Sequence, residues 1–137
     1  MQILVDTSVW VDYFGGVLTR ETDYLDGALG QGWLVVGDLI VAEVLAGYKE
    51  KESFEAARRA LLQFGSHQLG TLEVALLAAE HTQRLRAEHG AAVPHPVDSL
   101  IAAFCLRWNL TLLHADPAFA PFEEHLGLQA ALPRRMG

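Results

Sequence analysis

The sequence is poor in cysteine and in basic residues, and both shortages exclude functions. Cys105 is the single cysteine in 137 residues, so the chain forms no internal disulfide and no cysteine metal cluster. Its position on an apolar helical pattern favours a buried structural thiol over a nucleophile. Lys and Arg number 10 against 17 Asp and Glu, which gives a net charge of −7. That balance disfavours nucleic-acid binding by charge alone, but not binding through metal ions held by acids.

Long apolar runs are also missing. No run reaches the roughly 18 residues of a membrane span, and the first residues lack the basic segment and apolar length of a signal peptide. We therefore expect a cytoplasmic protein without membrane association. A hydrophobic content of 51% with 20% charged residues argues against disorder. The length fits one domain, predicted at residues 1–131, followed by a flexible tail at 132–137.

Short apolar strands alternate with amphipathic helices along the chain. Strands are predicted at residues 2–5, 33–36, 67–69, 110–114 and 128–131. Helices are predicted after N-caps at Thr7 or Ser8, Thr19, Asp38 and Ser53, over residues 71–89, and from about Pro96. Residues 117–125 are irregular or a short helix. This alternation predicts a parallel sheet with helices covering both faces.

Four carboxylates interrupt apolar segments near the ends of strands or the starts of helices. They are Asp6, Glu43, Asp98 and Asp116. In open parallel sheets, sites form beyond the carboxyl ends of the strands, so this spacing permits all four to converge. Burying an isolated carboxylate costs several kcal/mol or forces its protonation. A divalent cation is the simplest group that would hold four of them together.

Each acid also has a structural interpretation. Asp98 suits a helix N-terminus, Asp6 is a possible N-cap, and Asp116 before Pro117 is typical of a turn. Glu43 is the hardest to explain in this way. The rest of residues 39–45 is apolar, and no basic residue lies three or four positions away to pair with it.

An acidic site of this kind suits metal-assisted hydrolysis of phosphodiester bonds. Mg²⁺ and Mn²⁺ prefer carboxylate oxygens and water. Such ions activate a water molecule and stabilise charge in the transition state, and they screen the acids from the incoming phosphate. Thr7 and Ser8 would orient a water ligand or hold Asp6, a role compatible with capping the following helix.

Four segments resemble the sequence motifs of PIN-domain ribonucleases, specifically the VapC toxins of bacterial toxin–antitoxin pairs. They are residues 5–14 (VDTSVWVDYF), 37–45 (GDLIVAEVL), 98–102 (DSLIA) and 112–119 (LLHADPAF). Their order and spacing match over about residues 2–131. A lone Asp-Thr-Ser is weak evidence, whereas four motifs in order are specific.

This resemblance implies a three-layer α/β/α sandwich with a central, mostly parallel sheet of four to five strands. It implies a Mg²⁺- or Mn²⁺-dependent endoribonuclease, inhibited by a cognate VapB-type antitoxin and commonly a homodimer. Asp6, Glu43, Asp98 and Asp116 match the acidic quartet of the family. Asp6 and Asp98 would be the main direct metal ligands, and Glu43 and Asp116 would bind directly or through water.

The sequence departs from the family pattern at two places. Pro96-Val97 stands where Thr-Ile often precedes the third acid, and Ala118 stands where a second Asp often follows the fourth. The missing carboxylate favours a one-metal resting state. It also motivates the alternative of a degenerate PIN domain that binds RNA or antitoxin without cutting.

Two other classes of α/β protein fit the sequence less well. A phospho-acceptor domain of the response-regulator type would need a lysine after a late strand, and no Lys follows Lys51. A haloacid-dehalogenase-like phosphatase would need an acid two residues after Asp6, where Ser8 stands.

Several residues near the motifs have two interpretations. Lys49 and Lys51 would track an RNA backbone, although solvated surface charge is the simpler expectation. His114 is the histidine nearest the acids in sequence, and a hydrogen-bonded residue at a strand end is favoured over a catalytic base. Trp10 would stack on a base, but core packing is favoured.

Overall fold

A four-stranded parallel sheet forms the centre of the protein. The computed structural model describes residues 1–93 and 95–133. The strands are β1 (Ile3–Val5), β2 (Leu34–Gly37), β3 (Gly65–His67) and β4 (Thr111–Leu113), in the order β3-β2-β1-β4. All three pairings are parallel, so the carboxyl ends of the strands lie at one edge of the sheet. Because β1 is flanked by β2 and β4, the residue that follows it lies at the middle of that edge.

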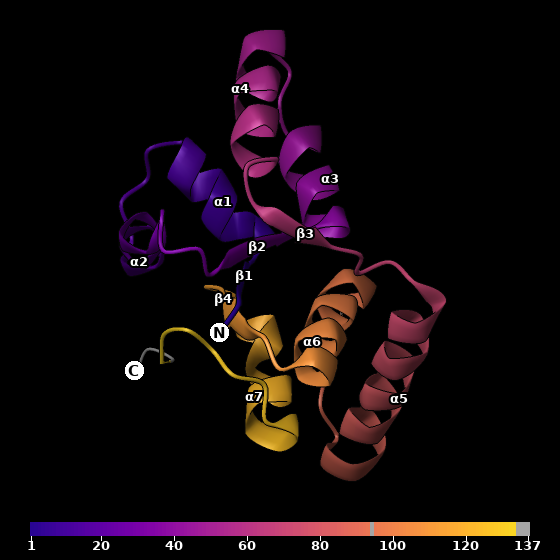
Figure 1. The fold of residues 1–137 in the computed structure, drawn as a ribbon. Coiled ribbons are helices and arrows are strands. Elements are labelled where there is room, and N and C mark those ends of the chain that lie inside the picture. Colours follow the sequence, from indigo (N-terminus) through magenta and orange to yellow (C-terminus); the bar gives the residue numbers. More distant parts are fainter. Residues whose placement is uncertain (94, 134–137) are drawn as a thin grey trace.

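Helices cover the two faces of this sheet in separate groups (Figure 1). One group contains α1 (Thr7–Phe14), α2 (Arg20–Ala28), α3 (Asp38–Ala46) and α4 (Lys51–Leu61). The other contains α5 (Leu72–His89), α6 (Pro96–Trp108) and α7 (Ala120–Leu126), with the short 3₁₀ helix η1 (Pro117–Phe119) before α7. The three-layer α/β/α sandwich that the resemblance implied is therefore confirmed. In the described part of the chain, no helix has the length and apolar character needed to cross a membrane.

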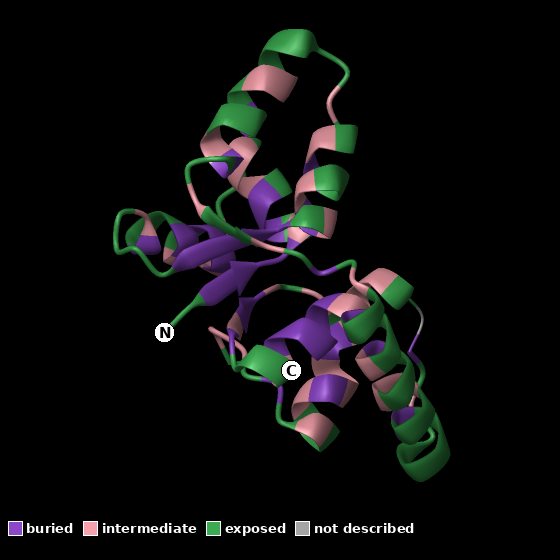
Figure 2. Ribbon diagram, turned by 45° about the vertical axis from the view of Figure 1, so that its right-hand side comes forward, coloured by how far each residue is buried: buried purple, intermediate pink, exposed green. Residues whose placement is uncertain are grey.

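The core lies between the sheet and the inner faces of the helices, where Figure 2 shows the buried residues gathered. Trp10 is 1% exposed, and its ring lies 5.5 Å from those of Phe14 and Phe64. This placement confirms the prediction that Trp10 packs in the core. Cys105 is equally buried, and burial raises the pKa of its thiol to about 12. The predicted burial of the thiol is confirmed, and the raised pKa disfavours the thiolate, which is the reactive form.

Local signals placed most helices correctly but misplaced several of their first residues. Thr19 caps α2 through a capping box, and Thr71 caps α5, which ends at Gly90 in the left-handed conformation. The N-cap of α1 is Asp6, as its structural interpretation allowed, rather than Thr7 or Ser8, and that of α3 is Gly37 rather than Asp38.

Two other elements are shifted from their predicted positions, and a third does not form a strand. The predicted tail lies mostly outside the described residues. Helix α4 begins at Lys51, before the predicted cap Ser53, and β3 lies two residues earlier than expected. The strand predicted at 128–131 is wrong, because it makes only one bridge, between Ala130 and Leu112. Of the predicted flexible tail, residues 134–137 lie outside the described residues.

The start of α3 is held by a close contact with the segment that follows β3. Oδ1 of Asp38 accepts hydrogen bonds from the backbone N–H groups of Leu39 and Leu69, at 2.9 and 2.6 Å. Leu69 is completely buried against Gly37, where a Cβ atom would lie 2.4 Å from Leu69 Cδ1. A side chain at position 37 would force the buried Leu69 to shift, so glycine suits this close approach at the start of α3.

We predict that Gly37→Ala lowers the free energy of unfolding by about 1–3 kcal/mol, because the added methyl group overpacks the contact with Leu69. Gly65→Ala in the neighbouring strand is the matched control, since its Cβ would meet its nearest atom, Val35 Cγ1, at an ordinary 3.9 Å. Urea unfolding of both variants measures the difference. Equal free energies of unfolding for the two variants would show that Leu69 can move aside without a loss of stability.

Candidate metal site

The structure brings the four predicted acids to the wall of one cavity of about 380 Å³. Asp6 follows β1 directly, Asp116 follows β4 by three residues, Asp98 lies in the first turn of α6, and Glu43 lies in the second turn of α3. The cavity is lined by Asp6, Thr7, Ser8, Val11, Asp12, Glu43, His95, Val97, Asp98 and Asp116. Strand ends and helix starts share this edge of the sheet, which is why acids so distant in sequence converge.

Asp6 has the most unfavourable environment of the four for a negative charge. It is 5% exposed, and its pKa is raised from 3.8 to about 7. Burial is the main cause, and a hydrogen bond from the backbone of Thr7 partly opposes it. The carboxylates of Asp98, Asp116 and Glu43 raise the pKa of Asp6 further by repulsion. Each of these three acids is therefore close enough to act on Asp6.

Asp98 lines the same cavity and shares this environment. Its pKa is raised chiefly by burial and next by the carboxylate of Asp116, with a smaller effect of Glu43. His95, at the N-cap of α6, lowers the pKa of Asp98 through its charge. The acids thus oppose each other's ionisation, and a bound cation would relieve that repulsion.

Hydroxyl groups of α1 contact two of the acids. Thr7 Oγ1 donates a hydrogen bond of 2.7 Å to Oε1 of Glu43, which joins the first turn of α1 to α3. Ser8 Oγ lies 3.5 Å from Oδ2 of Asp6, the outer limit of a hydrogen bond. We expected Thr7 and Ser8 to orient a water ligand or to hold Asp6, whereas the shorter side-chain hydrogen bond runs from Thr7 to Glu43.

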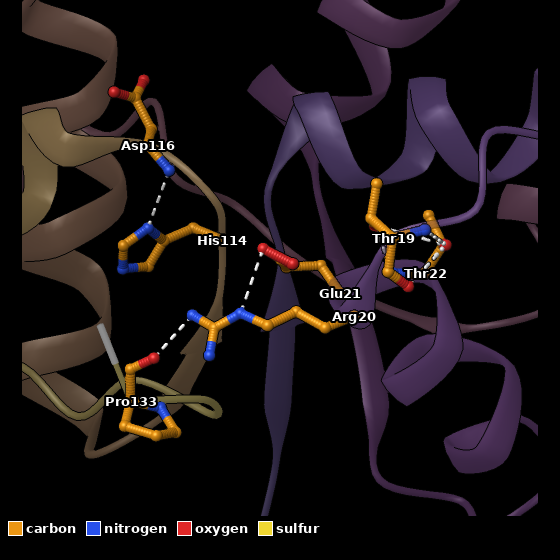
Figure 3. Close-up of polar contacts among 7 residues, drawn as sticks. All are labelled: Thr19, Arg20, Glu21, Thr22, His114, Asp116 and Pro133. Carbon is orange, nitrogen blue, oxygen red and sulfur yellow. Dashed lines mark hydrogen bonds and ion pairs between the residues drawn. The ribbon is translucent and has the colours of Figure 1, made fainter. Parts of the chain in front are cut away.

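Asp116 is held by its own turn and by the preceding histidine. Its Oδ1 accepts the backbone N–H of Ala118 at 2.9 Å, and its own N–H donates to Nδ1 of His114 at 3.1 Å (Figure 3). Burial lowers the pKa of His114, although the nearby carboxylate of Glu123 raises it. The predicted hydrogen-bonded histidine at a strand end is therefore confirmed.

Two polar residues of the cavity wall, Asp12 and His95, were not identified from the sequence. Asp12 lies one helical turn after Ser8, so the helical spacing places both on one face of α1 and was a usable signal. His95 lies three residues before Asp98, in a loop whose course the sequence pattern does not determine. Lys49 and Lys51 do not line the cavity, and no Lys or Arg is among its described lining residues.

The side chains of the cavity suit a hard divalent cation that keeps part of its water shell. All four acids offer oxygen donors, which Mg²⁺ and Mn²⁺ prefer, and Mg²⁺ typically binds through one or two carboxylates plus water. Within the described residues, no three His, Cys, Asp or Glu side chains form a ready-made metal cluster. A cation here would be held by carboxylates of this set, with water completing its coordination.

We predict that Asp6→Asn stabilises the metal-free protein at pH 8 by roughly 1–3 kcal/mol, because it removes a charge that is costly to bury. Between pH 3.8 and about 7 the folded chain holds the Asp6 proton more tightly than the unfolded chain. Wild-type stability therefore falls as pH rises through this window, and the advantage of the variant disappears near pH 4.

Urea unfolding in EDTA at pH 4, 6 and 8 measures this difference. Asp23→Asn, an exposed residue of α2, controls for the general effect of one fewer negative charge. A variant that is less stable than wild type by the same amount at every pH would contradict the prediction.

Comparison with known proteins identifies the family. The PIN domain family matches residues 3–124. Among solved structures, a chain of VapBC2 from Rickettsia felis bound to a DNA fragment from their promoter has a TM-score of 0.74 and 17% identity, over 95% of this chain and 97% of that one. FitAcB from Neisseria gonorrhoeae has a TM-score of 0.71 and 19% sequence identity, over 94% of this chain and 96% of that one. A chain of a toxin–antitoxin complex from Klebsiella pneumoniae has a TM-score of 0.62 and 23% sequence identity, over 87% of this chain and 91% of that one. The family match covers most of the sequence, and the chain therefore belongs to the PIN domain family.

Proposed function

We propose that this protein is the toxin of a toxin–antitoxin pair and a metal-dependent endoribonuclease that hydrolyses RNA phosphodiester bonds. One observation carries the proposal: Asp6, Glu43, Asp98 and Asp116 line a single cavity at the carboxyl edge of the sheet of a PIN domain. Burial and mutual repulsion raise the pKa of Asp6 and of Asp98. That environment favours the binding of a divalent cation.

The acids have distinct roles in this proposal. Asp6 and Asp98 bind Mg²⁺ or Mn²⁺ directly, and Glu43 and Asp116 bind it directly or through water. The bound ion supplies an activated water and stabilises negative charge on the phosphate. Thr7 holds Glu43 through its 2.7 Å hydrogen bond. With Ala118 in place of a second Asp, one ion is the resting state.

An antitoxin of the VapB type is the proposed protein partner. One of the similar structures is a toxin–antitoxin complex from Klebsiella pneumoniae, and another is VapBC2 from Rickettsia felis. A net charge of −7 and an acidic cavity suit a basic segment of such a partner. We further propose that the toxin is cytoplasmic, where its RNA substrates are.

A homodimer is proposed from the surface of α5. Leu72 is 77% exposed and Leu76 is 58% exposed, one turn apart on the same face. A second copy of the chain would cover this apolar face.

The alternative is a degenerate PIN domain that binds RNA or antitoxin without cutting. Ala118 favours it, because a carboxylate frequent in the family is absent and only the backbone of Ala118 contacts Asp116. The intact set of four acids opposes it. A degenerate site would show no specific binding of Mg²⁺ or Mn²⁺.

We predict that Asp6→Asn and Asp98→Asn each lower the rate of RNA cleavage at least about 100-fold, since loss of a metal ligand removes several kcal/mol of transition-state stabilisation. Purified proteins are incubated with total cellular RNA, with Mn²⁺ or with EDTA. Both variants should also lose the growth inhibition that wild type causes on expression.

Asp23→Asn is the matched control, and thermal unfolding shows that each variant is folded. Undiminished cleavage by both active-site variants would contradict the nuclease proposal. Absent cleavage by a folded wild type that also fails to bind Mn²⁺ in calorimetry would favour the degenerate domain.

A further inference from the structure

The backbone of Asp116 is hydrogen-bonded to His114, a residue that does not itself line the acidic cavity. The ring of His114 lies below the backbone of Asp116 in Figure 3, while the carboxylate of Asp116 points away from the ring. The backbone N–H of Asp116 donates to Nδ1 of His114. Together with the hydrogen bond from Ala118 to the carboxylate, this contact sets both the backbone and the side chain of Asp116.

The direction of that hydrogen bond determines the protonation of the imidazole ring. A backbone N–H can only donate, so Nδ1 of His114 accepts and carries no proton. The proton of the neutral ring is therefore on Nε2. The ring is also fixed in place, because it packs against Phe119 with 4.7 Å between ring centroids.

A carboxylate on α7 faces the protonated side of the ring. Oε1 of Glu123 lies 3.3 Å from Nε2 of His114, and the side chains of the two residues are 13% and 7% exposed. Both atoms are buried and have no hydrogen-bond partner in the described part of the chain, so their 3.3 Å approach is a close polar contact and not an aligned hydrogen bond. Each buried atom thus has the other as its natural partner, and an acceptor at this place favours the proton on Nε2.

We propose that Glu123 and His114 are positioning residues for Asp116: Glu123 selects the Nε2–H tautomer of His114, which leaves Nδ1 free to accept the N–H of Asp116. The inference rests on the proposed function, because it takes Asp116 to be a metal ligand. Ligand carboxylates and histidines in metal sites are commonly oriented by such outer contacts. Neither His114 nor Glu123 touches the substrate or the ion in this arrangement.

Two substitutions at His114 separate positioning from packing. His114→Leu removes the acceptor and keeps an apolar side chain, and we expect the Kd for Mn²⁺ to rise about tenfold, the lower end for loss of an outer contact. His114→Asn places an amide oxygen near the position of Nδ1, and most of the wild-type affinity should remain. Calorimetric titration of the folded proteins with Mn²⁺ measures Kd, and thermal unfolding measures stability separately.

Two substitutions at Glu123 test the tautomer. Glu123→Gln keeps an oxygen that faces Nε2–H, so this variant should bind Mn²⁺ like wild type, whereas Glu123→Leu should weaken binding several-fold. The ¹⁵N NMR signals of His114 report the protonated nitrogen directly. We expect Nε2–H in wild type and in Glu123→Gln, and a mixture of tautomers in Glu123→Leu. Glu52→Leu, at an exposed position of α4, is the control.

The outcomes separate this inference from the function on which it rests. Wild-type affinity in folded His114→Leu and Glu123→Leu would overturn the positioning role, and so would a proton on Nδ1 in the wild type. If His114→Leu fails to fold, the NMR signals and the pair of Glu123 variants decide the question. If Asp6→Asn also binds Mn²⁺ like wild type, the metal site itself is wrong.

Discussion

Burial of the Asp6 carboxylate at the end of the central strand sets the electrostatics of the whole acidic cavity. Asp6 follows β1 between β2 and β4, where little water reaches it. Its pKa of about 7 reflects that burial and the repulsion of three neighbouring acids. The other contacts of the site, from Thr7 to Glu43 and from Ala118 to Asp116, hold groups that would otherwise separate. The arrangement is costly for the protein alone and becomes favourable with a cation.

The scaffold holds each acid on a different element, so that no local rearrangement moves all four. The parallel sheet brings the ends of β1 and β4 together, and the helices α3 and α6 begin at the same edge. Gly37, the N-cap of α3, allows a close contact with the buried Leu69 where α3 leaves β2. Preorganised carboxylates of this kind bind an ion without first paying for their own ordering.

The charge of the protein constrains how RNA would be bound in the proposed function. The net charge of −7 repels a polyanion, and the described lining of the acidic cavity contains no Lys or Arg. A metal ion would therefore supply the positive charge that the site lacks. The same shortage of cations makes the acidic surface suitable for a basic partner, which agrees with control by an antitoxin.

The features that could be predicted from the sequence are those that depend on residues close together in the chain. The alternation of apolar and amphipathic segments predicted the parallel sheet with its covering helices, and Thr19 and Gly90 marked helix ends through local backbone chemistry. The four acids were identified because a charge in an apolar run is costly wherever the chain folds. The N-cap of α3 was misassigned to Asp38, since the carboxylate of Asp38 accepts the N–H of the distant Leu69 and Gly37 takes the capping position.

Only the tertiary structure decided which acid is most deeply buried, that Thr7 contacts Glu43, and that Glu123 faces His114. These relations join segments far apart in sequence, and they depend on distances that no local pattern encodes.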